Sequence, residues 1–260
     1  MEVIISKTYD LMCKAAAQVV AGVLNTKPDA VLGLATGSTP LGLYKELARM
    51  HKEENLDFSQ VTTFNLDEYV GLPASHDQSY HYFMNENFFK HVNISPRNIH
   101  IPSGTTNNYE AFCNWYEQRI RDCGGVDIQI LGIGSDGHIA FNEPGSSLGS
   151  RTRIKTLAKQ TIDDNARFFA KAADVPIYAI TMGVGTILES RKLLLMANGK
   201  KKAAAVAGAI EGPVTCMNTA SALQLHRDAV VFTDEDAAGE LKMVEYYKWI
   251  QANKPGAPKR

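Results

Sequence analysis

One histidine and two carboxylates follow an apolar stretch near the middle of the chain. The stretch 126–133 is rich in Val, Ile and Leu, as is typical of a strand buried on both faces of a parallel sheet. Asp136, His138 and Glu143 come directly after it. Ligands bind outside the carboxyl ends of such strands, and an imidazole between carboxylates can move protons. The pattern predicts an acid/base site. The alternative is a polar turn with a hydrogen-bonded histidine.

The same loop contains a glycine spacing that also occurs in dinucleotide-binding proteins. A G-x-G-x-x-G match of that kind needs a helix at its last glycine and an acid about 20 residues later. Here Asn142–Gly145 interrupts any helix, and 154–157 contains no acid. A metal site is also disfavoured, because no second histidine or cysteine lies close in sequence. We therefore expect neither a dinucleotide nor a metal at this loop.

Two adjacent acids follow another predicted buried strand, at 61–65. Asp67 and Glu68 lie at its carboxyl end, in the same position relative to a strand as the histidine loop. Such pairs are commonly solvated loops or helix starts. Their position after a buried strand favours a catalytic interpretation.

Small and hydroxylated residues follow the predicted strand 30–34. Gly37, Ser38 and Thr39 precede a predicted helix, and free amides with short hydroxyls at a helix N-terminus can bind an anion. The alternative is a tight turn, with Thr39 capping the helix and Pro40 at its first position. A basic triplet, 200–202, opens a later predicted helix. Cations there oppose the helix dipole unless an anion neutralises them.

Alternating strands and helices must position these residues, which predicts an α/β fold. We expect one domain, 1–260, with a frayed tail at 251–260. The expected strands are 2–6, 30–34, 61–65, 126–133, 152–157, 176–182, 193–197 and 229–233, and the expected helices are 9–24, 41–51, 80–89, 107–121, 161–169, 200–211 and 237–250.

Composition narrows the classes of function. The formal net charge is −1, so we expect neither nucleic acid nor a membrane as partner. The 4 cysteines form no C-x-x-C pair, as in reduced proteins of the cytoplasm. The first residues do not resemble a signal peptide, and no apolar run approaches the ~18 residues of a membrane helix. These features predict a soluble cytoplasmic protein.

Four segments together closely resemble the glucosamine-6-phosphate deaminase (isomerase) family. They are TGSTP, FNLDEYVGLP, GIGSDGHIAFNEPGSSLGSRTRIKTL and GKKKA, and the likeness runs from about Val31 to Lys242. The related 6-phosphogluconolactonases share G-x-D-G-H but continue differently, so Phe141–Pro144 separates the two. The resemblance implies a doubly wound, mostly parallel, Rossmann-like sheet that binds no dinucleotide. It also implies homo-oligomers, of which the regulated ones are hexamers.

The implied reaction converts D-glucosamine 6-phosphate and water to D-fructose 6-phosphate and ammonia, without a cofactor. By resemblance His138 opens the sugar ring, Asp136 and Glu143 orient it, and Asp67 moves the proton between C2 and C1. The 6-phosphate is expected to bind residues of the first loop and two cations, namely Gly37, Ser38, Thr39, Arg167 and Lys202. The alternatives are a lactonase of the same superfamily and a non-enzymatic sugar-phosphate sensor.

The resemblance also implies a regulatory site for N-acetylglucosamine 6-phosphate. Its expected residues are Ser146, Ser147, Arg153 and Lys155; the alternative is that these basic residues face solvent. Regulated relatives have a tyrosine that lines up with Lys248, whereas here Tyr247 lies one residue earlier. One residue turns a helical side chain by about 100°, so we expect a weakened or absent response.

Overall fold

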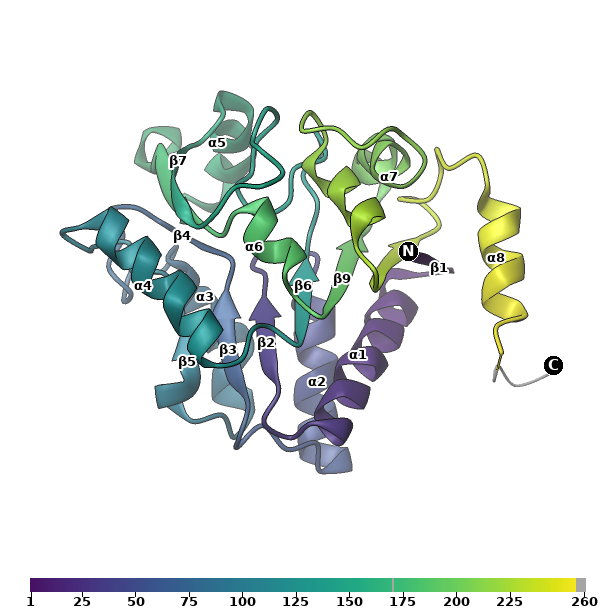
Figure 1. Cartoon of the computed structure of the whole chain (residues 1–260), viewed down its shortest axis with the longest axis horizontal. Helices are drawn as coiled ribbons and strands as arrows, with labels where there is room; N and C mark the ends of the chain where they lie inside the picture. The colour runs from purple at the N-terminus through teal and green to yellow at the C-terminus, as the bar shows by residue number, and fades with distance from the viewer. Residues whose placement is uncertain (170, 256–260) are drawn as a thin grey trace.

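The main sheet of this computed structural model, which describes residues 1–169 and 171–255, has seven strands. They are β1 (Glu2–Ser6), β2 (Val31–Leu34), β3 (Thr62–Asn65), β5 (Ile99–His100), β6 (Ile128–Leu131), β9 (Lys192–Ala197) and β10 (Ala229–Asp234). Their order is β1-β10-β9-β6-β2-β3-β5, and every neighbouring pair is parallel. The carboxyl ends of the strands therefore share one edge, which lies at the top of Figure 1.

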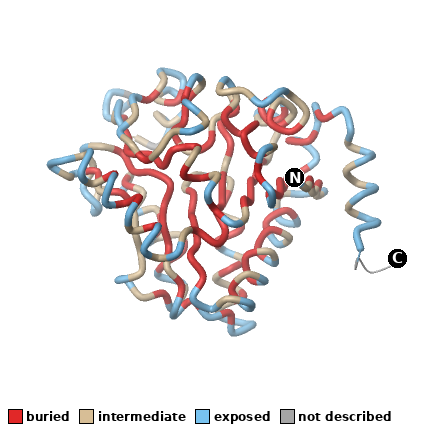
Figure 2. Tube along the Cα trace, in the orientation of Figure 1, coloured by how far each residue is buried: buried red, intermediate tan, exposed pale blue. Residues whose placement is uncertain are grey.

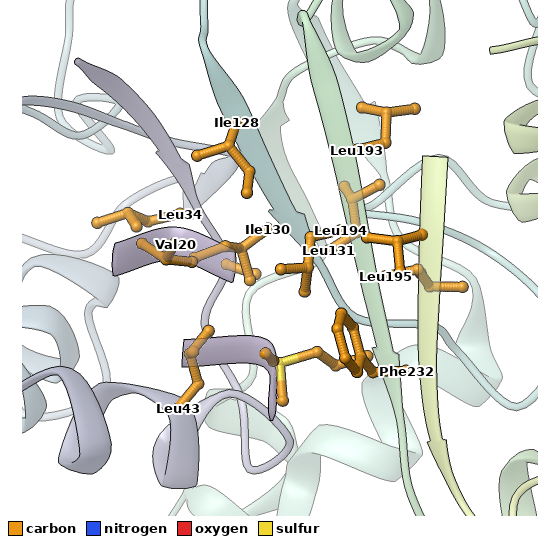
Figure 3. Packing of buried hydrophobic residues seen from close by; sticks show 14 of the residues in the cluster. Val20, Leu34, Leu43, Ile128, Ile130, Leu131, Leu193, Leu194, Leu195 and Phe232 are labelled. Atoms are coloured by element: carbon orange, nitrogen blue, oxygen red, sulfur yellow. The ribbon is translucent and has the colours of Figure 1, made fainter. Parts of the chain in front are cut away.

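Helices cover both faces of this sheet (Figure 1). The helices of the described residues are α1 (Tyr9–Thr26), α2 (Leu41–Glu54), α3 (Tyr80–Asn87), α4 (Tyr109–Asp122), α5 (Lys159–Asn165), α6 (Val184–Leu188), α7 (Ala203–Ile210) and α8 (Val244–Ala252). Of these, α5 lies above the carboxyl edge and α8 at one side of the molecule (Figure 1). Val20 of α1 and Leu43 of α2 pack against sheet residues such as Ile130 (Figure 3). On the opposite face Tyr116 of α4 meets Phe64 edge to face at 5.5 Å. The predicted doubly wound α/β fold is confirmed.

The strand order reverses direction between β2 and β6. From β2 the chain continues to β3 and β5 on one side, and from β6 it continues to β9 and β10 on the other. In open α/β sheets the loops at such a reversal diverge, and ligands bind in the crevice between them. The loops after β2 and β6 therefore mark the expected ligand crevice of this chain. The predicted anion loop and the predicted histidine loop are the two loops that border this crevice.

A second, smaller sheet lies over the carboxyl edge. It contains β4 (Asp67–Tyr69), β8 (Tyr178–Thr181) and β7 (Arg153–Thr156), all antiparallel. Two of its strands were predicted as strands, but β4 was not. Tyr69 of β4 packs with Phe141 in a hydrophobic cluster separate from that of the main sheet. Figure 2 shows that buried positions follow the central strands of the main sheet, whereas α8 lies at one side of the molecule and has no buried residue.

Several predicted helix boundaries are wrong. The last helix begins at Val244 instead of residue 237, because Asp234 accepts a hydrogen bond from the Ala237 amide and holds a turn there. The basic triplet forms a 3-10 turn, Lys200–Lys202, before α7 begins. Helix α8 extends through Ala252, so residues 251 and 252 are not frayed, and residues 256–260 of the predicted tail lie outside the described residues. Within the described ranges, no helix has the length and hydropathy needed to cross a bilayer.

Candidate active site

The predicted acid/base residues converge in the loop after β6. Nδ1 of His138 lies 2.7 Å from Oδ1 of Asp136 and 3.6 Å from Oε2 of Glu143. The shorter contact is an ion-pair distance whose angle falls outside hydrogen-bond geometry. Burial alone would raise the pKa of Asp136, but the contact with His138 outweighs it and holds that pKa below its usual value. Asp136 is therefore an ionised partner for the imidazole.

Glycine at two positions lets this loop fold tightly around the imidazole. The Gly134 amide donates to the His138 carbonyl at 2.8 Å, and a side chain at Gly134 would overlap the imidazole. Gly137 has a φ of +91°, a conformation that glycine adopts without strain. Glu143 is fixed separately, because its Oε1 accepts the Ala158 amide at 3.1 Å. The glycine spacing thus positions a histidine, and it opens no dinucleotide-binding helix.

Asp67 lies where β3 turns into the small sheet. It is only 6% exposed, and no hydrogen bond to its carboxylate is formed within the described residues. Burial, and then the neighbouring charge of Glu68, raise the pKa of Asp67 to about 8. The side chains of residues 67 and 68 project to opposite faces of β4, since side chains alternate along a strand. A carboxyl group with this pKa is a stronger base than an exposed aspartate.

Glu68 is fully buried and is held by several donors. It accepts the backbone amides of Tyr69 at 2.8 Å, Tyr80 at 3.0 Å and His81 at 3.1 Å. The ring Nδ1 of His81 also lies 2.9 Å from Glu68 Oε2. Two of these amides belong to the first turn of α3, so Glu68 caps that helix. The sequence singled out the acidic pair but assigned no cap to Glu68.

The loop after β2 is positioned by contacts that the sequence did not reveal. Thr39 does not cap α2; its hydroxyl donates to Oδ1 of Asn198 at 2.8 Å, and Pro40 is the residue before the helix. The Tyr9 hydroxyl donates to the Thr39 carbonyl at 2.8 Å and accepts the Gly42 amide at 2.8 Å. Ser38 is exposed and Gly37 is partly buried, between these anchors and β2. The capping alternative is therefore wrong for Thr39.

Lys202 differs from the other two lysines of its triplet. Lys200 and Lys201 are exposed, whereas Lys202 is half-buried at the residue before α7. Burial lowers the pKa of Lys202, and it lies close enough to Asp136 and Arg167 for both charges to act on that pKa. Arg167 belongs to the 3-10 turn Ala166–Phe168 and has an interaction of its own. Lys202 thus lies near both the histidine loop and Arg167.

Asp136, His138 and Glu143 also form a group that could hold a cation. Their ligand atoms all lie within 4.8 Å of one another. One nitrogen and two oxygens match the donor set of some three-ligand metal sites. The proton-transfer chemistry that we infer below needs no metal, and chelation is its direct test.

The predicted regulatory residues differ in their surroundings. Ser146 is 4% exposed and Ser147 is exposed. Arg153 and Lys155 share the partly buried face of β7, as alternation predicts. Arg153 Nη1 donates to Oδ1 of Asn142 at 2.9 Å, so its guanidinium points toward the histidine loop. An effector site at these residues remains a prediction.

Comparisons with known proteins agree with the geometry. The glucosamine-6-phosphate deaminase of Cellvibrio japonicus is 52% identical over 251 residues, covering 96% of this chain and 95% of that protein. A solved structure described as a monomeric glucosamine-6-phosphate deaminase is 48% identical, with a TM-score of 0.91 over 92% of this chain and 100% of its own. The 6-phosphogluconolactonase from Trypanosoma brucei shares the fold, with a TM-score of 0.73 over 92% of this chain and 98% of its own, at 19% identity.

The sequence model described as glucosamine-6-phosphate isomerases/6-phosphogluconolactonase matches residues 6–231. This match covers most of the chain, including both loops at the crevice and the basic triplet. The chain belongs to the family of glucosamine-6-phosphate isomerases and 6-phosphogluconolactonases.

Proposed function

We propose that the chain is a glucosamine-6-phosphate deaminase, converting D-glucosamine 6-phosphate and water to D-fructose 6-phosphate and ammonia. The observation that carries this proposal is the pairing of a buried, high-pKa Asp67 with the His138 cluster at one sheet edge. Support also comes from the 52% identity to the Cellvibrio japonicus deaminase, against 19% to the Trypanosoma brucei lactonase.

The histidine cluster suits the first step, the opening of the pyranose ring. A proton must leave O1 and reach the ring oxygen as the C1–O5 bond breaks, giving an aldehyde at C1. His138 can accept the first proton and deliver it to the second oxygen. Asp136 stabilises the imidazolium that forms between the two transfers. Oε2 of Glu143 lies 3.6 Å from the same ring nitrogen, Nδ1 of His138. The cluster thus provides a proton shuttle together with its counter-charge.

Asp67 suits the second step, the movement of a proton from C2 to C1. With the amine entering as its ammonium form, removal of the C2 proton and transfer of one ammonium proton to O1 give an enolamine, and return of the C2 proton to C1 gives an iminium ion at C2. Water then adds to C2, and the carbinolamine that forms loses ammonia to leave the C2 ketone. A base in a dry site with its pKa near 8 has the proton affinity that carbon deprotonation requires. All of these steps are proton transfers or additions, so no redox cofactor takes part.

The 6-phosphate suits the loop after β2 together with the two predicted cations. The loop with Gly37, Ser38 and Thr39 offers hydroxyls and amides before α2, and Lys202 and Arg167 offer positive charge. A guanidinium, an ammonium and backbone amides match a phosphate dianion. The same anion would relieve the unfavourable position of Lys202 at the start of α7.

An assay of two products tests the function. Purified protein is incubated with glucosamine 6-phosphate, and ammonia and fructose 6-phosphate are measured together; equal release of both is expected. Hydrolysis of 6-phosphogluconolactone without ammonia release would instead establish the lactonase alternative. Binding of sugar phosphates without turnover of either compound would point to a sensor.

The proposal extends to the setting of the enzyme. We place it in the cytoplasm as a single domain that forms homo-oligomers, on the strength of the sequence resemblance. Sedimentation analysis would test the assembly, since one structurally similar relative is described as monomeric.

A further inference from the structure

A short segment, 216–220, lies between the histidine loop and α7. The Ala220 amide donates to the Gly137 carbonyl at 2.9 Å, and the Gly145 amide donates to the Cys216 carbonyl at 2.9 Å. Asn218 donates to the Ala205 carbonyl of α7 at 3.0 Å. The segment therefore contacts the loop that carries His138 and the helix that follows Lys202. None of these residues was predicted from the sequence to take part in the site.

Asn218 fills the space between those two elements. A side chain at Gly137 would overlap the Asn218 amide, and one at Gly208 of α7 would crowd it at 2.8 Å. Both glycines therefore allow a close approach that Asn218 occupies. This packing sets how far the histidine loop lies from α7, and hence from Lys202 at the start of that helix.

Thr219 is the buried polar residue of the segment and holds the loop directly. It is 0% exposed. Its hydroxyl accepts the Ile139 amide at 3.1 Å and donates to the Asn142 carbonyl at 3.0 Å. One hydroxyl thus bridges two backbone groups of the loop, one immediately after His138 and one immediately before Glu143.

The bridged stretch contains a strained residue and is held by several contacts. Ala140, in its middle, has a φ of +52°, which costs a non-glycine residue free energy and persists only where neighbours impose it. The Thr181 hydroxyl accepts the Phe141 amide at 3.0 Å, and Asn142 donates to the Ile139 carbonyl through its backbone amide at 3.1 Å and its side-chain amide at 3.0 Å. Thr219 adds the one hydroxyl that bonds both ends of the stretch, and this bridge contributes to the separation of His138 from Glu143.

We propose that Thr219 is a positioning residue that sets the geometry of His138 against Glu143 through its bridge between the Ile139 amide and the Asn142 carbonyl. The effect expected on the rate rests on the proposed deaminase function. The effect expected on the order of the loop rests on the hydrogen bonds alone. Valine has the shape of threonine but can neither accept nor donate. Serine retains the hydroxyl that makes both bonds.

The test compares three variants with the wild type. Thr219→Val removes the bridge and Thr219→Ser restores it. Thr233→Val is the matched control, because Thr233 is also 0% exposed and its hydroxyl has no hydrogen-bond partner among the described residues. Rates of ammonia release from glucosamine 6-phosphate give kcat and KM. Hydrogen exchange at the amides of residues 137–142 gives the order of the loop without any need for activity.

We expect kcat of Thr219→Val to fall on the order of 10²-fold, as small misplacements of catalytic groups do, with KM changing much less. Thr219→Ser should recover most of this rate, and Thr233→Val should stay close to the wild type. Loop amides should exchange faster in Thr219→Val alone. If Thr219→Val does not fold, as judged by circular dichroism, Thr219→Ala takes its place.

Two results would overturn the proposal. One is a Thr219→Val rate equal to that of Thr233→Val; the other is a serine variant as slow as the valine variant. A wild-type protein that releases no ammonia would refute the deaminase function instead. Hydrogen exchange would then decide on Thr219 by itself: unchanged exchange of the loop in Thr219→Val refutes the bridge, and faster exchange supports it.

Discussion

Asp67 and Asp136 occupy the same kind of position, after the carboxyl ends of two parallel strands of the main sheet, β3 and β6, yet their surroundings differ. Asp67 is buried beside the negative Glu68, and its pKa is raised to about 8. Asp136 is half-buried beside His138, and its pKa is lowered. One carboxyl group therefore binds a proton strongly, while the other stays ionised.

This contrast assigns different work to the two acids. Titratable groups whose surroundings move their pKa values in opposite directions commonly divide acid/base roles between them. Asp67 has the proton affinity of a base that exchanges protons with carbon. Asp136 has the permanent charge that a histidine shuttle needs. With the opposite pKa shift, Asp67 would be a weaker base and Asp136 would lose the charge that the imidazolium needs.

The largest expected effect follows from removing the carboxylate of Asp67. Asp67→Asn should lower kcat on the order of 10²- to 10⁴-fold, because general-base catalysis is lost. The KM for glucosamine 6-phosphate should change little, since the phosphate-binding residues are untouched. Steady-state ammonia release measures both constants. Near-normal turnover would refute the assignment and make Glu68 the first candidate for the base.

Asp67→Asn should lower the rate but stabilise the folded protein at high pH. A carboxyl group whose pKa is raised in the folded state stabilises the fold fully below its unfolded pKa and loses that contribution as the pH rises through about 8. Asparagine carries no such charge. Asp67→Asn should therefore raise the melting temperature relative to the wild type at pH 9 more than at pH 4. An equal shift at both pH values would contradict the raised pKa.

Loss of one phosphate-binding cation should have the next largest effect. Lys202→Ala should raise the KM for glucosamine 6-phosphate about 10- to 100-fold, the range expected when a charged hydrogen bond is lost. Lys200→Ala is the matched control, because Lys200 is exposed in the same triplet. Sensitivity at Lys200 instead of Lys202 would show that the phosphate binds outside the crevice.

A smaller effect is expected from neutralising Glu68. The rate should rise with pH through about 8, since Asp67 must lose its proton to act as a base. Glu68→Gln keeps an oxygen for the amides of α3 but removes the charge, so Asp67 should ionise at a lower pH. The acidic limb of kcat/KM should move to lower pH, and the plateau should fall several-fold because the base is weaker. A lower rate with an unmoved limb would mean that Glu68 acts only as a helix cap.

Local patterns were sufficient to predict most strands of the main sheet. Runs such as 126–133 and 193–197 are buried on both faces, so their composition alone is diagnostic. The short strand β4 was missed because Asp67–Tyr69 is brief, polar and separated from β3 by Leu66 alone. The pairing of β7 with β8 was also inaccessible, since periodicity indicates a strand but not its partner.

The site divides in the same way. His138, its carboxylates and Asp67 follow strands whose ends the sequence located, so they could be predicted as a group. Thr219 could not, because it lies some 80 residues from the loop that it bridges, in a stretch without a local motif. The helix predicted at 237–250 fails for a related reason: Asp234 holds a turn where local propensity favours helix.

The smallest expected effect concerns N-acetylglucosamine 6-phosphate, and it extends the contrast to regulation. Arg153 reaches the histidine loop through Asn142, whose amide also donates to the Ile139 and Met182 carbonyls. No corresponding contact from the predicted effector residues to Asp67 occurs within the described residues. A phosphate bound at Arg153 and Lys155 would therefore compete with Asn142 for the guanidinium and act on His138 alone.

The tyrosine near the C-terminus is not free to contact an effector. The Tyr247 hydroxyl donates a hydrogen bond to Glu211 Oε1 at 3.2 Å. We expect the effector to bind and to change kcat or KM less than about twofold, well within the ~1.4 kcal/mol of a tenfold effect. Substrate saturation curves with and without the acetylated sugar measure this. Strong sigmoidicity relieved by the effector would contradict it, and if Arg153→Lys then abolished the relief, the route through Asn142 would be established instead.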